Sequence, residues 1–548
     1  MKADLLIVNA SVWTGHPAQP RAQAIGLKGD QIVFVGSDDE AGGLQAGRTI
    51  GAAGRSVLPG FIDNHQHLFF ASAELDNLAA EHLSEYQALE RAILAHARAT
   101  PEREWICVSH VQYSALPHGG LTRQHLDRLA PARPLLLMDY SYHTAWANTR
   151  ALELAGLLHG AHCGPGSTIV QDTHGTATGE LREPSAFAAV LALTGSWGRA
   201  THAYTHGHET VGSPAEQSAD RQMIVRGLER NASLGITSVQ NMDGDAYQLG
   251  LYHQLEEEGL LSARLSVPLM VRPETPVAAL RDMAALSHSF RGDWVRSGRL
   301  KFFMDGVIEN GQAFMLEPYA ALPGRGAPLF GAETFRELAC EGDRLGLQLS
   351  IHAIGDAALR RTLDGLEEAR RRNGARDSRH RVEHLETVHP DDLRRLAELG
   401  VMASMQPGHV PGTGLVPLSL WLEAVGPARW ATAFPWRDLK RTGARLTFGS
   451  DWPIISQNPL LGLRAALTRD PWQPGDPDQR LSLDEALHAY TTEGAAAEFM
   501  ERRKGSLRPG YLADVVMLSA SLDDVAPERL VGVAVDLTVA GGRVVYER

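Results

Sequence analysis

Cysteine is scarce in this chain, with only Cys107, Cys163 and Cys340 among its 548 residues. Their number is odd, their spacing is wide and none forms a CxxC pair, which argues against a disulfide framework and against a thiolate zinc site. We therefore expect histidine and carboxylate-type oxygen to hold any metal.

Long apolar runs and long basic blocks are missing as well. No segment reaches the roughly 18 uninterrupted apolar residues that a membrane helix needs. The net charge is −13, without a cluster of lysine and arginine that would attract nucleic acid. These absences predict a cytoplasmic protein whose partners include neither a membrane nor nucleic acid.

What is present is the composition of a globular protein, with 44% hydrophobic and 21% charged residues. Short strand-like segments alternate with longer helical ones, which is typical of a parallel α/β sheet. The predicted strands are 56–67, 235–242, 263–271, 298–305, 347–356, 380–386, 400–408 and 444–453. Eight strands with helical connectors predict a (β/α)8 TIM-like barrel.

The remaining segments predict accessory parts. Residues 1–57 and 505–548 read as β hairpins with Gly-containing turns, and we expect both chain ends to form one small β-sandwich domain. The metal-dependent barrel would then span 58–504. Roughly 160 residues separate the first two barrel strands, too many for a barrel loop, so an inserted subdomain is expected at about 72–218.

Polar side chains fall repeatedly where the predicted strands end, which is where barrel active sites form. Each has an ordinary alternative: a lone histidine is more often a surface or core residue, a lysine can extend into water, and an aspartate can cap a turn. His65 and His67 are two residues apart, so on a strand both rings face one point. The candidates are His65, His67, Lys301, His352, His384 and Asp451.

Together the motifs "GFIDNHQH", "KFFMDGVIENGQA", "IHAIGDAA", "RVEHLE" and "GSDWPI" resemble the amidohydrolase superfamily. Within it, the chain is similar to the YtcJ-like branch, amidohydrolase family 3, which includes N-substituted formamide deformylases. The segments "YHTAWANTRALELAGL" and "GTATGELRE" in the insertion resemble the same branch.

The resemblance implies a centre of two divalent metals, expected to be Zn2+. His65, His67 and Asp451 would bind the more buried ion, and His352 and His384 the more exposed one. Lys301 would bridge both after its amine reacts with CO2 to form a carbamate, because an ammonium has no lone pair. An unmodified lysine in a salt bridge stays open as an alternative.

The implied activity is hydrolysis of a C–N amide bond in a small N-acyl or N-formyl compound by a metal-activated hydroxide, with Asp451 as the catalytic acid and base. Alternatives are a cyclic amide hydrolase, a deaminase, or a non-catalytic binding protein on the same barrel. We expect His143, Trp146, Asp305 and Glu309 to contact substrate, although a structural turn or a loop-holding role would also explain them. A homodimer is compatible with the sequence.

Overall fold

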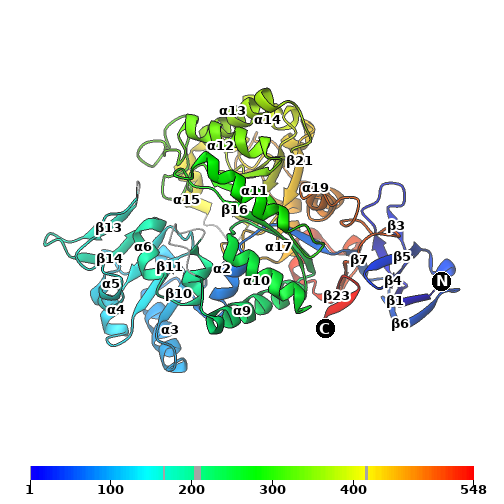
Figure 1. The fold of residues 1–548 in the computed structure, drawn as a ribbon, viewed down its shortest axis with the longest axis horizontal. Coiled ribbons are helices and arrows are strands. Elements are labelled where there is room, and N and C mark those ends of the chain that lie inside the picture. Colours follow the sequence, from blue (N-terminus) through cyan, green and yellow to red (C-terminus); the bar gives the residue numbers. More distant parts are fainter. Residues whose placement is uncertain (1, 165–166, 203–210, 414–417) are drawn as a thin grey trace. The chain divides into compact units, whose positions relative to one another are not determined.

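The computed structural model describes residues 2–164, 167–202, 211–413 and 418–548. The chain divides into two compact units (Figure 1). The first comprises Met1–His67 with Leu228–Arg548, and the second comprises Leu68–Gly227. Among the described helices, none combines the length and the hydropathy that a membrane crossing requires.

The first unit contains the barrel. Its parallel strands are, in spatial order, β8 (Phe61–Gln66), β15 (Ile236–Asn241), β16 (Arg264–Met270), β17 (Val295–Phe303), β18 (Gln348–Ala353), β19 (Arg381–His384), β20 (Met402–Met405) and β21 (Arg445–Phe448). Each strand pairs with the next one along the chain. Past the end of β21, Asp451 N donates to His65 O at 2.6 Å and His67 N donates to Trp452 O at 2.9 Å, which joins the last strand to the first. The predicted (β/α)8 barrel is confirmed.

Helices connect the strands, as the sequence periodicity predicts. They are α9 (Pro214–Ser233), α10 (Ala246–Glu257), α11 (Leu280–Ser289), α12 (Ala332–Arg344), α13 (Asp356–Asn373), α14 (Pro390–Glu398), α15 (Leu418–Val425), α16 (Trp436–Arg441), α17 (Pro459–Thr468), α18 (Leu483–Ala489) and α19 (Thr492–Ala497), with 3-10 turns η2 (Val277–Ala279), η3 (Pro407–His409) and η4 (Pro427–Thr432).

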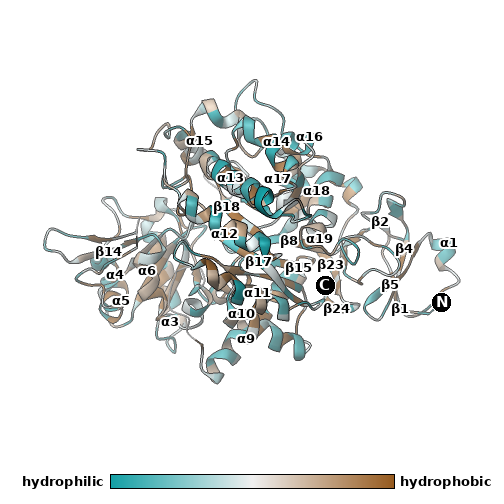
Figure 2. Ribbon diagram, turned by 45° about the horizontal axis from the view of Figure 1, so that its top comes forward, coloured by the Kyte–Doolittle hydropathy of each residue, from teal (hydrophilic) through white to brown (hydrophobic). Residues whose placement is uncertain are grey.

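The pair β18–α13 illustrates how the sequence produces one barrel unit. Every residue of β18 is buried, as expected for a strand covered on both faces. Helix α13 starts at Asp356 and has three arginines in its last turn, so its charges complement the helix dipole. It ends at Gly374, whose φ of 87° suits glycine. Figure 2 shows hydrophilic residues along this helix, which keep its outer face in water.

Both chain ends build the predicted β-sandwich, which is confirmed. One sheet has the order β5 (Gln31–Gly36), β4 (Ala24–Lys28), β1 (Lys2–Val8) and β6 (Gln45–Gly51). The other has the order β24 (Arg543–Glu547), β23 (Val535–Ala540), β22 (Val515–Leu518), β7 (Ser56–Pro59), β2 (Ser11–Trp13) and β3 (Arg21–Ala22). The same two chain ends also contain the short helix α1 (Asp38–Ala41) and the 3-10 turns η5 (Leu522–Asp524) and η6 (Pro527–Gly532). A core that includes Ile7, Ile25, Val57, Val515 and Val539 fills the space between the sheets.

Glycine makes the step from the sandwich to the barrel possible. Gly60 stands between β7 and β8, and a Cβ atom there would lie 2.2 Å from Thr237 Oγ1. A side chain at this position would therefore push β15 away from β8. The short connection carries the chain straight from a terminal strand into the first barrel strand.

The second unit is the large insertion after the first barrel strand, as predicted. Its sheet has the order β13 (Thr168–Gln171), β14 (Ala177–Arg182), β12 (Thr144–Ala147), β11 (Leu135–Asp139), β10 (Ile106–Val111) and β9 (Leu78–Ala79). The unit also contains helices α2 (Leu68–Glu74), α3 (Tyr86–Ala99), α4 (Arg123–Leu129), α5 (Thr149–Leu154), α6 (Pro184–Leu191) and α7 (Ser196–Ala200), and the 3-10 turn η1 (Tyr113–Ala115). A separate core containing Leu89, Ile93, Leu126 and Leu137 shows that this unit buries its own apolar surface.

Candidate metal centre

Imidazole rings gather at the carboxyl ends of the barrel strands. The ring centroids of His65 and His384 are 4.8 Å apart, and those of His352 and His384 are 4.4 Å apart. His67 lies 5.7 Å from His65 by the same measure. The four predicted histidines therefore form one continuous group, although they come from three strands spread over some 300 residues of chain.

Asp451 lies among these rings. Its Oδ1 is 3.3 Å from His65 Nε2 and 3.1 Å from His67 Nε2. Its Oδ2 is 4.0 Å from His384 Nδ1. One ligand atom from each of His65, His384 and Asp451 falls within 4.8 Å of the others, a spacing that a single metal ion can span.

The backbone is strained where two of these side chains enter the group. Asp451 has a φ of 65° and His384 a φ of 78°, both in the left-handed region that residues other than glycine rarely adopt. Such strain costs on the order of 1–3 kcal/mol and concentrates at functional sites. Where β21 meets β8, a Cβ atom on Gly449 would lie 2.4 Å from His65 N, so only glycine lets these two strands approach this closely.

Buried carboxylates orient His65, in β8, and His67, just after it. His65 Nδ1 donates to Glu383 Oε2 at 2.8 Å, and His67 Nδ1 lies 3.1 Å from Asp243 Oδ1. With Nδ1 so engaged, the Nε2 atoms of both rings face Asp451. Histidines that bind metals are commonly oriented in this way by a carboxylate. Sequence reasoning missed Glu383 and Asp243, although each directly follows a strand segment or adjoins a predicted ligand.

Electrostatics keep the donor atoms available. Burial alone would raise the pKa of Asp451, but the charge of the His65 ring holds that pKa well below its usual value. Burial lowers the pKa of His384 far below normal, and the charge of His352 adds to this. The carboxylate is therefore ionised and the His384 ring is neutral at neutral pH, and these are the forms that bind divalent metals.

Lys301 lies on β17 inside the barrel and is completely buried. Its Nζ has no hydrogen-bond partner among the residues that the structure describes and lies 4.8 Å from the Phe303 ring centroid. Burial lowers the pKa of this amine to about 8, while the charges of Glu383 and Asp451 oppose the shift. An appreciable fraction of the amine is therefore uncharged at mildly alkaline pH.

The donor set fits a divalent metal. Within the described parts of the chain, Asp451 Oδ1, His384 Nδ1 and Lys301 Nζ are buried polar atoms without a hydrogen-bond partner. Buried polar atoms are normally satisfied, so three such atoms at the mouth of one barrel need an explanation. Imidazole nitrogen with carboxylate oxygen is a ligand set that zinc accepts.

A further histidine that sequence reasoning missed enters the group from β20. His409 ends η3, its ring is stacked on His384 with centroids 5.6 Å apart, and its Nε2 is 3.4 Å from Asp451 Oδ2. Its Nδ1 is 3.6 Å from Glu386 Oε1. The only signal in the sequence is its place just after the seventh predicted strand, in "MASMQPGH".

The other predicted site residues of the first unit lie on the loop after β17. Asp305 is buried, and its carboxylate accepts hydrogen bonds from the backbone amides of Phe314, Ile354 and Gly355 at 2.9–3.1 Å. These are the contacts of a residue that holds a loop. Glu309 is half-buried on the same loop.

In the second unit, His143 and Trp146 have different surroundings. His143 Nδ1 lies 2.8 Å from Glu183 Oε2, and its backbone amide donates to Asp139 at 2.9 Å. Glu183 has a left-handed φ of 67°. Trp146 is 2% exposed and belongs to the hydrophobic core of its unit. His143 is therefore the more accessible polar group of the pair.

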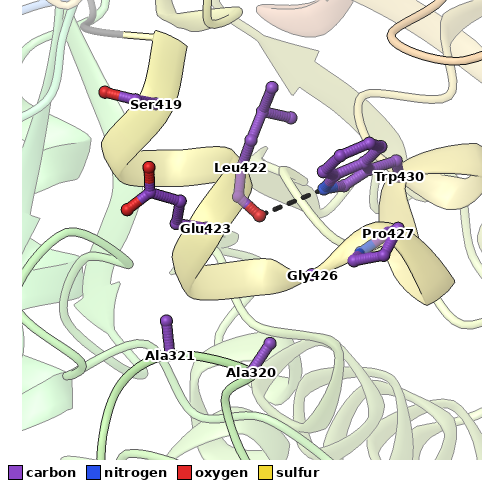
Figure 3. Close-up of a pocket in the computed structure, with 8 residues that line it drawn as sticks. All are labelled: Ala320, Ala321, Ser419, Leu422, Glu423, Gly426, Pro427 and Trp430. Carbon is purple, nitrogen blue, oxygen red and sulfur yellow. Dashed lines mark hydrogen bonds between the residues drawn. The ribbon is translucent and has the colours of Figure 1, made fainter.

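A hollow of about 670 Å3 lies beside α15 and η4 (Figure 3). Across it, Trp430 Nε1 donates to Leu422 O at 3.2 Å. The lining residues are Ala320, Ala321, Ser419, Leu422, Glu423, Gly426, Pro427 and Trp430. None of them belongs to the histidine group, so this hollow is not the candidate metal centre.

A (β/α)8 barrel whose strand ends gather imidazoles, an ionised carboxylate and a buried lysine has the architecture of a metal-dependent hydrolase. Residues 48–546 match the family model described as "Amidohydrolase family". The chain therefore belongs to the amidohydrolase family, and the resemblance seen in the motifs is confirmed, as is the expected class of hydrolases acting on C–N bonds.

Similar proteins cover nearly the whole chain. Protein LONG AFTER FAR-RED 3 of Arabidopsis thaliana is 29% identical, covering 99% of this chain and 92% of its own length. The N-substituted formamide deformylase of Arthrobacter pascens is 29% identical, covering 100% and 98%. A solved structure, an uncharacterized metal-dependent hydrolase from Pyrococcus furiosus, shares the fold with a TM-score of 0.71 at 24% identity, covering 96% of this chain and 99% of that one.

Proposed function

We propose that this enzyme hydrolyses the C–N amide bond of a small N-acyl or N-formyl compound and uses two divalent metal ions, Zn2+ in the first instance. The observation that carries the proposal is the convergence of His65, His384 and Asp451 within 4.8 Å. The similarity to an N-substituted formamide deformylase over the full chain supports the choice of an acyclic amide.

In this proposal, His65, His67 and Asp451 bind one ion, and His352 and His384 bind the other. The carboxylates of Glu383 and Asp243 support it because they lie against Nδ1 of His65 and His67 and so turn Nε2 of both rings toward Asp451. When bound, divalent ions polarise a carbonyl oxygen and make water acidic enough to act as a nucleophile near neutral pH.

Lys301 would bridge the two ions as a carbamate. The support is its complete burial, its amine without a hydrogen-bond partner in the described structure, and its pKa of about 8. An uncharged amine attacks CO2, a C–N bond forms, and the released proton leaves an anionic carbamate. Such a group supplies two oxygen ligands where an ammonium would repel a cation.

Asp451 would move the proton during catalysis. Its carboxylate accepts a proton from the attacking water as the new C–O bond forms, and delivers that proton to the nitrogen as the C–N bond breaks. The products are a carboxylic acid and an amine. The position of the carboxylate among the predicted ligand rings supports this assignment, with Oδ1 3.3 Å from His65 Nε2 and Oδ2 4.0 Å from His384 Nδ1.

Substrate recognition would involve His143 and Glu309. His143 supports this role because its Nδ1 lies 2.8 Å from Glu183 Oε2, which fixes the orientation of a ring that is 13% exposed. Trp146 and Asp305 would affect recognition indirectly. Trp146 would stabilise the core of the insertion, and Asp305 would hold the loop after β17. This assigns the choice of acyl and amine groups to loops and to the insertion.

The test is a substrate panel with metal-loaded protein. N-formyl, N-acetyl and N-acyl amino compounds are incubated with the enzyme, and amine release is followed by chromatography. We expect turnover of at least one acyclic amide, and a loss of about 100- to 10,000-fold in Asp451→Asn, the usual contribution of general acid–base catalysis. Turnover confined to lactams or to amino-purine-type substrates, or none in protein that holds two metal equivalents, would contradict the proposal.

A further inference from the structure

The two oxygens of Asp451 have different neighbours. Oδ1 faces the Nε2 atoms of His65 and His67 at 3.3 and 3.1 Å. Oδ2 faces His409 Nε2 at 3.4 Å, closer than the 4.0 Å to His384 Nδ1. A carboxylate can rotate and exchange its oxygens unless something holds one of them. His409 is in the position to do so.

His409 is itself held by a buried chain of side chains. Its Nδ1 lies 3.6 Å from Glu386 Oε1, and the other oxygen of Glu386 accepts a hydrogen bond from Trp421 Nε1 at 2.7 Å. Glu386 is 5% exposed and Trp421 is fully buried. The chain therefore runs from helix α15 through the end of β19 to the ring of His409.

The same arrangement occurs three times around Asp451. His65 has Glu383 on Nδ1, His67 has Asp243, and His409 has Glu386. In each case the Nε2 atom faces an oxygen of Asp451. A carboxylate on Nδ1 fixes the direction of the opposite nitrogen. His409 is therefore oriented toward Asp451 in the same way as His65 and His67.

The geometry argues against His409 as one more metal ligand. Its Nε2 faces Asp451 Oδ2, whereas Nε2 of His65 and of His67 face the other oxygen, Oδ1. Its ring lies nearly parallel to that of His384, at an interplanar angle of 25°.

We propose, on the basis of the proposed amide hydrolysis, that His409 is a positioning residue for Asp451. With Glu386 and Trp421 behind it, His409 Nε2–H donates to Oδ2 and keeps Oδ1 turned toward His65 and His67. The carboxylate thereby presents one oxygen to the metal side and the other to the proton that is transferred. In this structure the two atoms are 3.4 Å apart and do not form a hydrogen bond. The bond would form on a small shift of the carboxylate, because catalytic hydrogen bonds often tighten only when substrate binds.

The experiment compares His409→Ala, His409→Asn and Trp421→Phe with the wild type in metal-loaded protein. For His409→Ala we expect kcat to fall about 10- to 100-fold, the effect of losing one hydrogen bond to a charged group. KM and bound metal should stay within about twofold. We expect intermediate kcat values for the other two variants. His409→Asn keeps a hydrogen-bond donor, and Trp421→Phe keeps an aromatic ring but loses the donor to Glu386.

Rescue by imidazole separates positioning from a structural role. Added imidazole should restore part of the activity of His409→Ala and leave the control His389→Ala unchanged. His389 is a suitable control because it caps α14 with a side chain that is 39% exposed. An unchanged kcat in His409→Ala, a lack of imidazole rescue, or loss of metal in step with activity would overturn the proposal.

A crystallographic comparison gives an answer even if no amide is turned over. In metal-loaded His409→Ala crystals the Asp451 carboxylate should be rotated or split between orientations relative to the wild type. An unmoved, single carboxylate orientation would refute the positioning role. Absence of turnover in the wild type would instead refute the proposed function alone.

Discussion

Replacing Asp243 by asparagine tests how the centre is oriented. Asp243 follows β15, is 1% exposed, and places Oδ1 3.1 Å from His67 Nδ1. Its Oδ2 accepts a hydrogen bond from Gln248 Nε2 at 3.1 Å. Asparagine has the same shape, so packing is preserved. The change removes the charge that makes His67 Nδ1 the protonated nitrogen and frees the ring to turn or to change tautomer.

The expected effect is on metal affinity. Loss of a carboxylate that orients a ligand histidine typically weakens metal binding about 10- to 100-fold. This corresponds to about 1.4–2.8 kcal/mol, because each factor of ten equals about 1.4 kcal/mol. Binding at the site that includes His67 should weaken, and kcat/KM at limiting metal should fall in proportion.

Competition with a fluorescent chelator measures the dissociation constant for zinc in Asp243→Asn and in wild type. The matched control is Asp523→Asn, the same chemical change in an exposed pair with Arg21 in the β-sandwich. The control should bind metal like the wild type, because exposed ion pairs contribute only about 0–1 kcal/mol. If Asp243→Asn bound zinc as tightly as the wild type while its melting temperature was unchanged, the reasoning about orientation would be refuted.

Three further predictions follow from single residues. Lys301→Ala should lower bound metal from about two to about one equivalent per chain by elemental analysis; a variant that keeps both ions would exclude the carbamate bridge. Gly449→Ala should cut kcat by on the order of 100-fold in the amide assay, since its Cβ would lie 2.4 Å from His65 N and displace the ring; near-normal activity would show that the contact between β21 and β8 adapts. Arg264→Ala should lower the free energy of unfolding by about 3–5 kcal/mol in urea titrations, because it leaves the buried Asp514, now 2.7 Å from Arg264 Nε, without its partner; a loss below about 1 kcal/mol would show that water replaces the arginine.

Sequence reasoning worked where chemistry follows directly from a strand. His65, in β8, and His67, just after that strand, have ring centroids 5.7 Å apart, as alternation of side chains along an extended segment predicts. The end of each parallel strand lies at the same rim, so residues such as His384 and Asp451 could be expected near them without knowledge of any contact. The same reasoning does not say which ring nitrogen faces inward, because that depends on a partner from another strand.

The partners that orient the centre were not visible in the sequence. Glu383 sits beside His384 but serves His65, which is 318 positions away. Glu386 and His409 come together only because β19 and β20 are neighbours in the barrel and α15 supplies Trp421. Glutamates and histidines at loop starts are common, and nothing in their local pattern distinguishes these from surface residues.

The sequence by itself determined the order of strands and helices, the hairpins at both ends, the insertion, and the polar residues at the strand ends, because each is written in local periodicity and turn chemistry. Only the tertiary structure decided which nitrogens and oxygens converge on Asp451, how deeply Lys301 is buried, and which carboxylate orients which histidine. These depend on strand register and on loop paths through space, and both are set by packing of the whole barrel rather than by any short segment.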